Sequence, residues 1–272
     1  MEYMDAYMAW PDDGWSIAPK MMVFACMWGL LHASLCASWH SRFMISRTFN
    51  RADSDHHEFA NLVISVCQAT FSGVLGARAL LSEEPFASRT LQVVNFDSSV
   101  DTVHGHSATL KAIMPVMLGY FLYDLVVAMI SPKGMEKLMI VHHFLCMVIW
   151  PISYHYRAGC HYLLCFTASE LSTPLVWLVA YFLPLFGVTG TARTALGGLL
   201  VLVFFLVRVL PAPALWWSLV SSQSYWADVP RAIYVTAMLT LPIPSMLFIY
   251  WWWHRLFLKL VEALTGSADK KD

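Results

Sequence analysis

Long apolar stretches separated by polar connections dominate the chain. Seven of them are long enough to cross the hydrocarbon core of a membrane, which takes ~20 helical residues. Backbone amides in lipid must be hydrogen-bonded within their own segment, and the stretches are too long for barrel strands, so each is predicted to be a helix. The predicted spans are residues 21–39, 59–81, 112–130, 138–156, 162–186, 195–219 and 232–258.

Composition agrees with this pattern. Apolar residues make up 58% of the 272 positions and charged residues 13%, which is less polar surface than a soluble domain carries. The formal net charge of −1 leaves no concentrated basic face to neutralise phosphates, which argues against a nucleic-acid partner. The predicted fold class is therefore an all-α, polytopic membrane protein.

The distribution of basic residues predicts the orientation. One set of alternate connections holds Arg42, Arg47, Arg51, Lys133, Lys137, Arg193, Arg255, Lys259, Lys270 and Lys271, whereas the other set has Lys20, Arg89, Lys111, Arg157 and Arg231 at or near its ends. The richer set is expected to be cytosolic. The acidic N-terminus does not resemble a cleavable signal, so the first span is predicted to stay as an anchor, with the N-terminus lumenal or extracellular and the C-terminus cytosolic. An odd number of spans satisfies this orientation.

The connections and the cysteines offer little evidence for a metal or disulfide site. An Asp101-x-x-His104-x-His106 run in the polar 82–111 connection can be read as part of a metal site, but four ligands are not visible and a solvated loop is favoured. The six cysteines show no paired spacing, so they are interpreted as buried, reduced, small apolar residues.

Four ionisable residues inside the apolar stretches are the main candidates for function: Asp124, His142, His143 and Glu170. Inserting such groups costs ~2.5 kcal/mol or more for Asp near a bilayer centre. Asp124 and the two histidines are expected at a similar depth near the cytosolic face, so they can meet. Because adjacent helical residues point ~100° apart, only one histidine can face Asp124 directly.

Glu170 and Arg208 form a second polar candidate at mid-membrane depth. An ion pair between them would offset the insertion cost of both, and a purely structural role is an equal alternative. Pro174 cannot donate to the Glu170 carbonyl, which predicts an unpaired acceptor and a broken turn beside a cavity. Kinks are also predicted at Pro151, Pro211, Pro213, Pro242 and Pro244.

The chemistry of a histidine beside a carboxylate leaves three roles open. The pair can act as a general base or nucleophile in acyl transfer, can bind a metal, or can be a structural contact. Membrane di-iron enzymes need several histidine boxes that this chain lacks, so no metal is assigned.

Four short runs carry a resemblance to a known family. They are Gly119-Tyr120-Phe121-Leu122-Tyr123-Asp124-Leu125, Val141-His142-His143-Phe144, Ala168-Ser169-Glu170-Leu171-Ser172-Thr173-Pro174 and Phe204-Phe205-Leu206-Val207-Arg208-Val209. Together, and in this order, they resemble the TLC domain (TRAM, LAG1 and CLN8 homology). The resemblance covers roughly residues 59–258 and implies a six-helix barrel around a cavity for lipid acyl chains, preceded by one extra helix. Glu170, Arg208, Tyr120 and Thr173 are then expected to line the cavity.

Within the family the chain is more similar to the non-ceramide-synthase, CLN8- and FAM57-like branch. Ceramide synthases carry a His-Asp-x-x-Asp type stretch where this chain reads Phe166-Thr167-Ala168-Ser169-Glu170. The resemblance therefore implies two functions. One is binding of acyl lipids or sphingolipid precursors in lipid metabolism or membrane lipid homeostasis. The other is an N-acyltransferase with acyl-CoA as co-substrate and His142, His143 and Asp124 as catalytic residues.

The resemblance also implies a domain organisation and a set of partners. The predicted parts are a lumenal or extracellular segment (residues 1–20), a leading helix and cytosolic loop (21–58), a TLC domain (59–260) and a cytosolic tail (261–272). The expected partners are membrane lipids, either an acyl lipid or a sphingoid base, with a homodimer left open and no permanently bound cofactor. A transporter or cargo receptor is a weaker alternative, because no inverted repeat is visible. The endoplasmic reticulum is the expected compartment and the plasma membrane the alternative.

Overall fold

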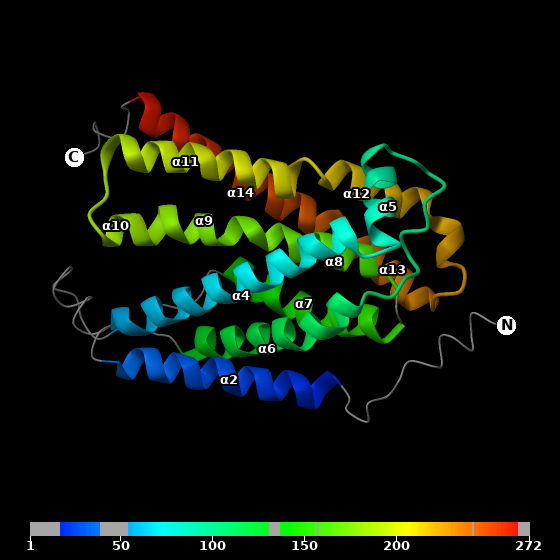
Figure 1. Ribbon diagram of the computed structural model, residues 1–272, viewed down its shortest axis with the longest axis horizontal. Helices are drawn as coiled ribbons and strands as arrows, with labels where there is room; N and C mark the ends of the chain where they lie inside the picture. Colours follow the sequence, from blue (N-terminus) through cyan, green and yellow to red (C-terminus); the bar gives the residue numbers. More distant parts are fainter. Residues whose placement is uncertain (1–16, 39–53, 131–136, 157, 241, 266–272) are drawn as a thin grey trace.

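The protein is an all-α bundle. The computed structural model describes residues 17–38, 54–130, 137–156, 158–240 and 242–265, and within these ranges it contains helices and no strand, which confirms the predicted class. The long helices run side by side (Figure 1). The elements are α2 (Ile17–Ala37), α4 (Ser54–Ser82), α5 (Phe86–Val94), α6 (Ala108–Ile130), α7 (Lys137–Tyr156), α8 (Cys160–Ser169), η1 (Glu170–Ser172), α9 (Thr173–Trp177), η2 (Leu178–Phe182), α10 (Leu183–Leu185), α11 (Gly190–Phe204), η3 (Phe205–Val209), α12 (Ala212–Ser221), η4 (Gln223–Trp226), α13 (Arg231–Thr240) and α14 (Pro242–Thr265).

Several of these helices can span a membrane. In the described ranges, five are long and apolar enough: Ile17–Ala37, His57–Ser82, Ala108–Ile130, Cys160–Leu185 and Gly190–Ser221. The apolar part of α7 is shorter, and the count of seven spans stays a prediction. The start of α2 and the end of α14 lie at opposite ends of the bundle, as an odd number of crossings requires (Figure 1).

Several predictions fall on parts of the chain outside the described residues. They concern the acidic N-terminal segment up to residue 16, the basic connection at 39–53, the short connection at 131–136 with Lys133, Arg157, and the tail from residue 266. Leu241, next to Pro242, is also outside them.

Prolines coincide with changes of helix type in the second half of the chain. A 3₁₀ turn, η1, ends two residues before Pro174, and a π-helix, η3, ends two residues before Pro211. The Glu170 carbonyl is not left unpaired as predicted, because the backbone N–H of Thr173 donates to it. A 3₁₀ turn makes this possible, since it pairs residues three apart instead of four. Pro151 lies inside α7, where the helix continues through it.

The long connection at 82–111 is more ordered than a solvated loop. It contains α5, which buries Phe86 and Val93 against the bundle. These two side chains are seven residues apart, so they share one face of the helix. The sequence predicted a polar connection over these residues and did not predict α5, because two apolar positions in a short polar stretch carry too weak a pattern.

The leading helix α2 packs closely on α6. A Cβ added at Gly119 would lie 2.6 Å from the Cβ of Phe24 and 2.9 Å from the backbone of Met21, so only glycine fits at this contact. Nearby, the indole N–H of Trp28 donates to the Val116 carbonyl at 3.4 Å. This contact places the polar side chains of α2 next to those of α6.

None of the six cysteines forms a disulfide. Cys146 and Cys160 are buried as predicted, but Cys26 and Cys67 are exposed on the surface of the bundle. An apolar sequence does not separate a helix face that packs on protein from one that faces lipid, since both favour apolar side chains.

Candidate functional site

The two adjacent histidines of α7 point to different partners. His143 and Asp124 of α6 are both buried, with 4% and 2% of their surface exposed. His143 Nδ1 lies 2.9 Å from Asp124 Oδ2, within ion-pair distance, although the ring is not oriented for a hydrogen bond. The structure thus brings Asp124 together with one histidine, as the 100° spacing of neighbouring helical residues requires.

The other oxygen of Asp124 begins a chain of hydrogen bonds that leads out of the core. Asn61 Nδ2 on α4 donates to Asp124 Oδ1 at 3.0 Å, and the Tyr123 hydroxyl donates to Asn61 Oδ1 at 2.9 Å. His32 Nδ1 on α2 lies 2.6 Å from the same hydroxyl. These four residues, Asp124, Asn61, Tyr123 and His32, are called the Asp124 chain below.

Sequence reasoning missed three members of the Asp124 chain. His32 lies inside the first apolar stretch, so the criterion that identified Asp124 would have found it. Asn61 and Tyr123 had no such signal, because polar side chains near span ends and tyrosines in apolar helices are common. Their contribution depends on which helices become neighbours.

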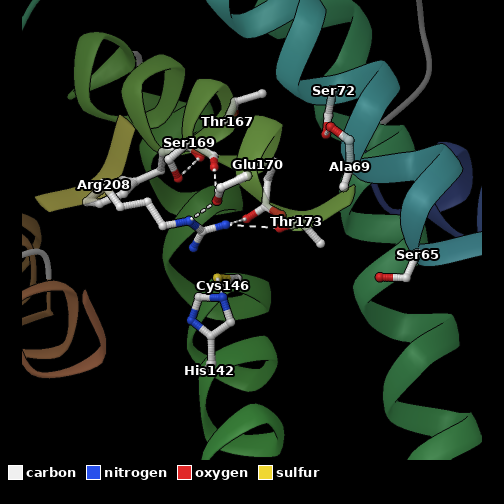
Figure 2. Close-up of polar contacts among 12 residues, drawn as sticks. Ser65, Ala69, Ser72, His142, Cys146, Thr167, Ser169, Glu170, Thr173 and Arg208 are labelled. Atoms are coloured by element: carbon white, nitrogen blue, oxygen red, sulfur yellow. Dashed lines mark hydrogen bonds and ion pairs between the residues drawn. The ribbon is translucent and has the colours of Figure 1, made fainter. Parts of the chain in front are cut away.

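His142 lies on the other side of α7. Its ring is 6.5 Å from that of Trp252 between centroids, and its Nε2 lies 4.0 Å from the sulfur of Cys146. Figure 2 shows His142 and Cys146 pointing toward the guanidinium of Arg208. The histidine pair therefore faces two separate polar groups, the Asp124 chain and the surroundings of Arg208.

The predicted ion pair between Glu170 and Arg208 is present. Arg208 Nη2 lies 3.3 Å from Glu170 Oε1, and their side chains are 12% and 23% exposed for arginine and glutamate. Thr173 Oγ1 donates to Glu170 Oε2 at 2.7 Å and accepts from Arg208 Nη2 at 3.0 Å. Arg208 Nε donates to Ser172 Oγ at 2.7 Å. We call these residues, Glu170, Ser172, Thr173 and Arg208, the Arg208 cluster.

Irregular helix geometry assembles the Arg208 cluster. Glu170 and Ser172 lie in the 3₁₀ turn η1, and Arg208 lies in the π-helix η3. Both helix types change the direction of successive side chains relative to an α-helix and often occur at functional sites. The guanidinium also lies 5.3 Å from the centre of the Phe204 ring, a cation–π contact.

Tyr120 is not part of the Arg208 cluster. It is buried on α6, and its ring lies 6.1 Å from the His143 ring in an edge-to-face arrangement. Of the four residues predicted to line the lipid cavity, Glu170, Arg208 and Thr173 come together, whereas Tyr120 packs beside the Asp124–His143 pair.

An apolar cavity of about 280 Å³ borders the Arg208 cluster. It lies between α4, α5, α8, η1, η3 and α12, and Arg208 is the one charged residue in its lining. The lining residues are Ala77, Leu80, Leu81, Thr90, Val94, Tyr162, Cys165, Phe166, Ala168, Ser169, Leu171, Val207, Arg208, Pro211, Ala212, Leu215, Trp216 and Leu219. A volume near the lower end of the ~300–1,000 Å³ typical of ligand pockets is enough for a small ligand or part of a lipid chain.

One comparison with known proteins identifies a family. A family model for the TLC domain matches residues 58–256, most of the chain. The chain belongs to the TLC domain family. It is an integral, multi-pass membrane protein with a lipid-related function. No curated protein and no solved structure matched the chain significantly.

The TLC domain contains every residue proposed from the sequence as a catalytic or cavity residue. Asp124, His142, His143, Glu170 and Arg208 all lie within residues 58–256, as do Tyr120 and Thr173. In contrast, α2 precedes the domain, and it supplies His32 to the Asp124 chain. A helix outside the TLC domain therefore completes a polar network that begins inside it.

The Asp101–His106 run forms local contacts near the end of the TLC bundle. Asp101 Oδ1 accepts from the backbone N–H groups of Val103 and His104 at 3.0 and 2.9 Å, and Asp101 Oδ2 lies 3.1 Å from His104 Nδ1. Arg89 Nη1 donates to the His104 carbonyl, and its Nη2 lies 3.9 Å from Asp101 Oδ2. The three residues form a small ion-pair network outside the membrane-spanning helices.

This network changes two pKa values. The hydrogen bond that His104 donates to Asp101 raises the pKa of His104, and partial burial opposes the shift. Partial burial acts to raise the pKa of Asp101, but the hydrogen bonds from His104 and the charges of His104 and Arg89 lower it overall. The imidazolium and the carboxylate thus stabilise each other.

Proposed function

We propose that this TLC-domain protein binds the acyl chain of a membrane lipid in the cavity beside Arg208, and that it acts in lipid metabolism or membrane lipid homeostasis. The observation that carries the proposal is an apolar cavity with a single charged group in its lining. Apolar walls bury methylene groups favourably, at ~0.8 kcal/mol each, and a few polar groups fix the orientation of a ligand. Acyl lipids and sphingoid bases have this combination of a long apolar tail and a polar end.

Arg208 is suited to hold the polar end of such a lipid. Its Nε and Nη2 donate to the residues of the Arg208 cluster, whereas Nη1 makes no hydrogen bond within the described residues. A carbonyl, phosphate or carboxylate oxygen can accept from Nη1 without breaking the pair with Glu170. His142 points toward the same guanidinium, but it is not among the residues that line the cavity (Figure 2).

Mass spectrometry of lipids retained by the purified protein tests this proposal. Ala77 on α4 lines the cavity, so Ala77→Phe is expected to fill it and to reduce the amount of co-purified lipid several-fold. Ala195→Phe makes the same change at an exposed position of α11 and is the matched control. Retention of the wild-type amount of lipid by a folded Ala77→Phe variant would contradict the proposal.

A second candidate function is acyl transfer from acyl-CoA to an amine, and the contact between His143 and Asp124 favours it. In this reaction the amine nitrogen attacks the thioester carbonyl, a histidine accepts the amine proton, and the same proton passes to the departing CoA thiolate when the carbon–sulfur bond breaks. A buried carboxylate 2.9 Å from an imidazole stabilises the protonated ring that forms in such a step. His142, which points toward the Arg208 cluster, is the second histidine available for it.

The two functions predict different amounts of acyl group attached to the protein after denaturation. If His142 or His143 is a transient acyl acceptor, an acyl adduct persists in the denatured wild-type protein and is absent from the His142→Ala, His143→Ala double variant. The single variants then identify the acceptor. Reversibly bound lipid that is unchanged in the double variant supports lipid binding alone. Localisation to the endoplasmic reticulum is part of the proposal, and fractionation of cells that express the tagged protein tests it.

A further inference from the structure

Three potential metal ligands converge where α2 meets the first helix of the TLC domain. His32 and Cys36 lie one turn apart on α2, and His57 lies near the start of α4. His32 Nε2 is 3.0 Å from His57 Nδ1, and Cys36 Sγ is 3.6 Å from the same nitrogen. All three ligand atoms lie within 4.8 Å of one another.

We propose that His32, Cys36 and His57 bind a Zn²⁺ ion that joins α2 to the TLC domain. Tetrahedral zinc with bonds of ~2.0–2.1 Å to nitrogen and ~2.3 Å to sulfur places two nitrogen ligands ~3.3 Å apart, and nitrogen and sulfur ~3.6 Å apart. The distances in the structure are close to these values. Two imidazoles and a thiolate suit zinc better than magnesium or calcium, which prefer oxygen ligands.

The Asp124 chain determines which nitrogen of His32 is available to the metal. The Asp124 carboxylate only accepts hydrogen bonds, so Asn61 must present Nδ2 to it and Oδ1 to Tyr123. The single Tyr123 proton is then donated to Asn61, so the Tyr123 oxygen accepts from His32 Nδ1. His32 Nε2 consequently carries a lone pair and points at His57.

This arrangement is the one expected around a metal-bound histidine. Ligating imidazoles donate their other ring N–H to a neighbouring acceptor, which fixes the tautomer and strengthens the ligand. Tyr123 has this role for His32, and it relates the proposed ion to Asp124 through Asn61. His57 is exposed and Cys36 is partly exposed, and both lie at ends of candidate spans, so the site is accessible from outside the bundle. Three protein ligands leave a fourth tetrahedral position for water.

Titration of the full-length purified protein with Zn²⁺ alone, after chelator treatment, tests the proposal. We expect a single ion to bind per chain and to raise the unfolding temperature. Co²⁺ in place of Zn²⁺ is expected to show the thiolate-to-metal absorption of a cysteine ligand. Cys36→Ser should abolish that absorption and weaken binding at least tenfold, whereas Cys26→Ser, an exposed cysteine on the same helix, should preserve both.

Two further variants distinguish a loss of Zn²⁺ binding from a loss of protein stability. His57→Ala changes an exposed side chain, so it should reduce Zn²⁺ affinity while the metal-free protein keeps its unfolding temperature. Tyr123→Phe should weaken binding about ten- to hundredfold without removing a ligand. Absence of saturable binding at one ion per chain, or equal affinity in Cys36→Ser, His57→Ala and the wild type, would overturn the proposal and leave a hydrogen-bonded histidine pair.

Discussion

The Asp124 chain and the Arg208 cluster each stabilise a carboxylate at membrane depth, but they do so with different partners. Asp124 is stabilised by a neutral amide and by one imidazole, and its hydrogen bonds continue through side chains on regular α-helices. Glu170 is stabilised by the cation of Arg208 and by the hydroxyl of Thr173, and Arg208 also donates to the hydroxyl of Ser172. The partners of Asp124 come together because α2, α4, α6 and α7 are aligned. The Arg208 cluster depends instead on the 3₁₀ turn η1 and the π-helix η3.

The difference indicates how each region can contribute to function. The Asp124–His143 pair is almost completely enclosed, so its surroundings are preorganised and exclude water. The Arg208 cluster borders the apolar cavity and is partly exposed, so a ligand can reach it. Chemistry that needs an oriented base fits the first region, and recognition of a lipid polar end fits the second.

The largest expected effect is that of Arg208→Ala. It leaves the Glu170 carboxylate partly buried without its cation, and we expect a loss of about 2–3 kcal/mol, less than for a fully buried pair because Glu170 is 23% exposed. Yield and unfolding temperature of the detergent-solubilised protein measure it. The double variant Glu170→Gln, Arg208→Gln removes both charges and should lose less. Equal losses in the single and double variants would show that the ion pair does not determine stability here.

A smaller effect is expected for Asp124→Asn. The substitution keeps the size of the side chain and an acceptor for Asn61, but it removes the charge beside His143, so we expect a loss of about 1–2 kcal/mol. Thermal unfolding in detergent measures it. Asp228→Asn, at an exposed position, is the control. If both variants unfold at the wild-type temperature, the buried carboxylate contributes no stability and the contrast with Glu170 fails.

Tyr123→Phe tests whether the Asp124 chain acts as one unit. It removes the hydroxyl that lies between His32 and Asn61, and we expect a loss of about 1 kcal/mol. Tyr250→Phe changes an exposed tyrosine of α14 and is the matched control. Circular dichroism during heating compares the two. An identical unfolding temperature for both variants would mean that the hydrogen bonds from α2 to α4 add nothing to stability.

The smallest effect concerns pH and the network of Asp101, His104 and Arg89 outside the membrane. Because the pKa of His104 is raised in the folded state, its contribution is complete below its ordinary value of 6.5 and is lost as the pH rises through the raised value. The lowered pKa of Asp101 gives a contribution present above its ordinary 3.8 and lost as the pH falls. The network is therefore most stabilising between these two values.

We expect this pH effect to be below about 1 kcal/mol, since partly exposed ion pairs are weak. The unfolding temperature of the wild type should decrease more than that of His104→Gln between about pH 6 and about pH 8. Asp228 and Arg89 also act on His104, in opposite directions, so the comparison is made at constant ionic strength. A larger decrease in the variant would contradict the assignment.

Periodicity and length were sufficient to predict the helices, because a membrane span needs ~20 apolar residues whatever its neighbours are. Within the described residues the predicted spans are helical except at Ser38, Phe186, Leu210 and Pro211, and the Glu170–Arg208 pair was expected from depth alone. The order of α5 and the exposed Cys26 and Cys67 were not predicted. These features depend on which helix face meets protein and which meets lipid, and an apolar sequence is the same for both.

The sequence by itself therefore determined the class of the protein, its helices and its family, since these follow from composition, length and local motifs. It also identified the charged residues that need partners at membrane depth. Only the tertiary structure decided which partner each one found: His143 and not His142 for Asp124, and Asn61, Tyr123 and His32 beyond it. The reason is physical, because hydrogen bonds act over about 3 Å and the relative rotation of neighbouring helices depends on contacts such as Gly119 against α2.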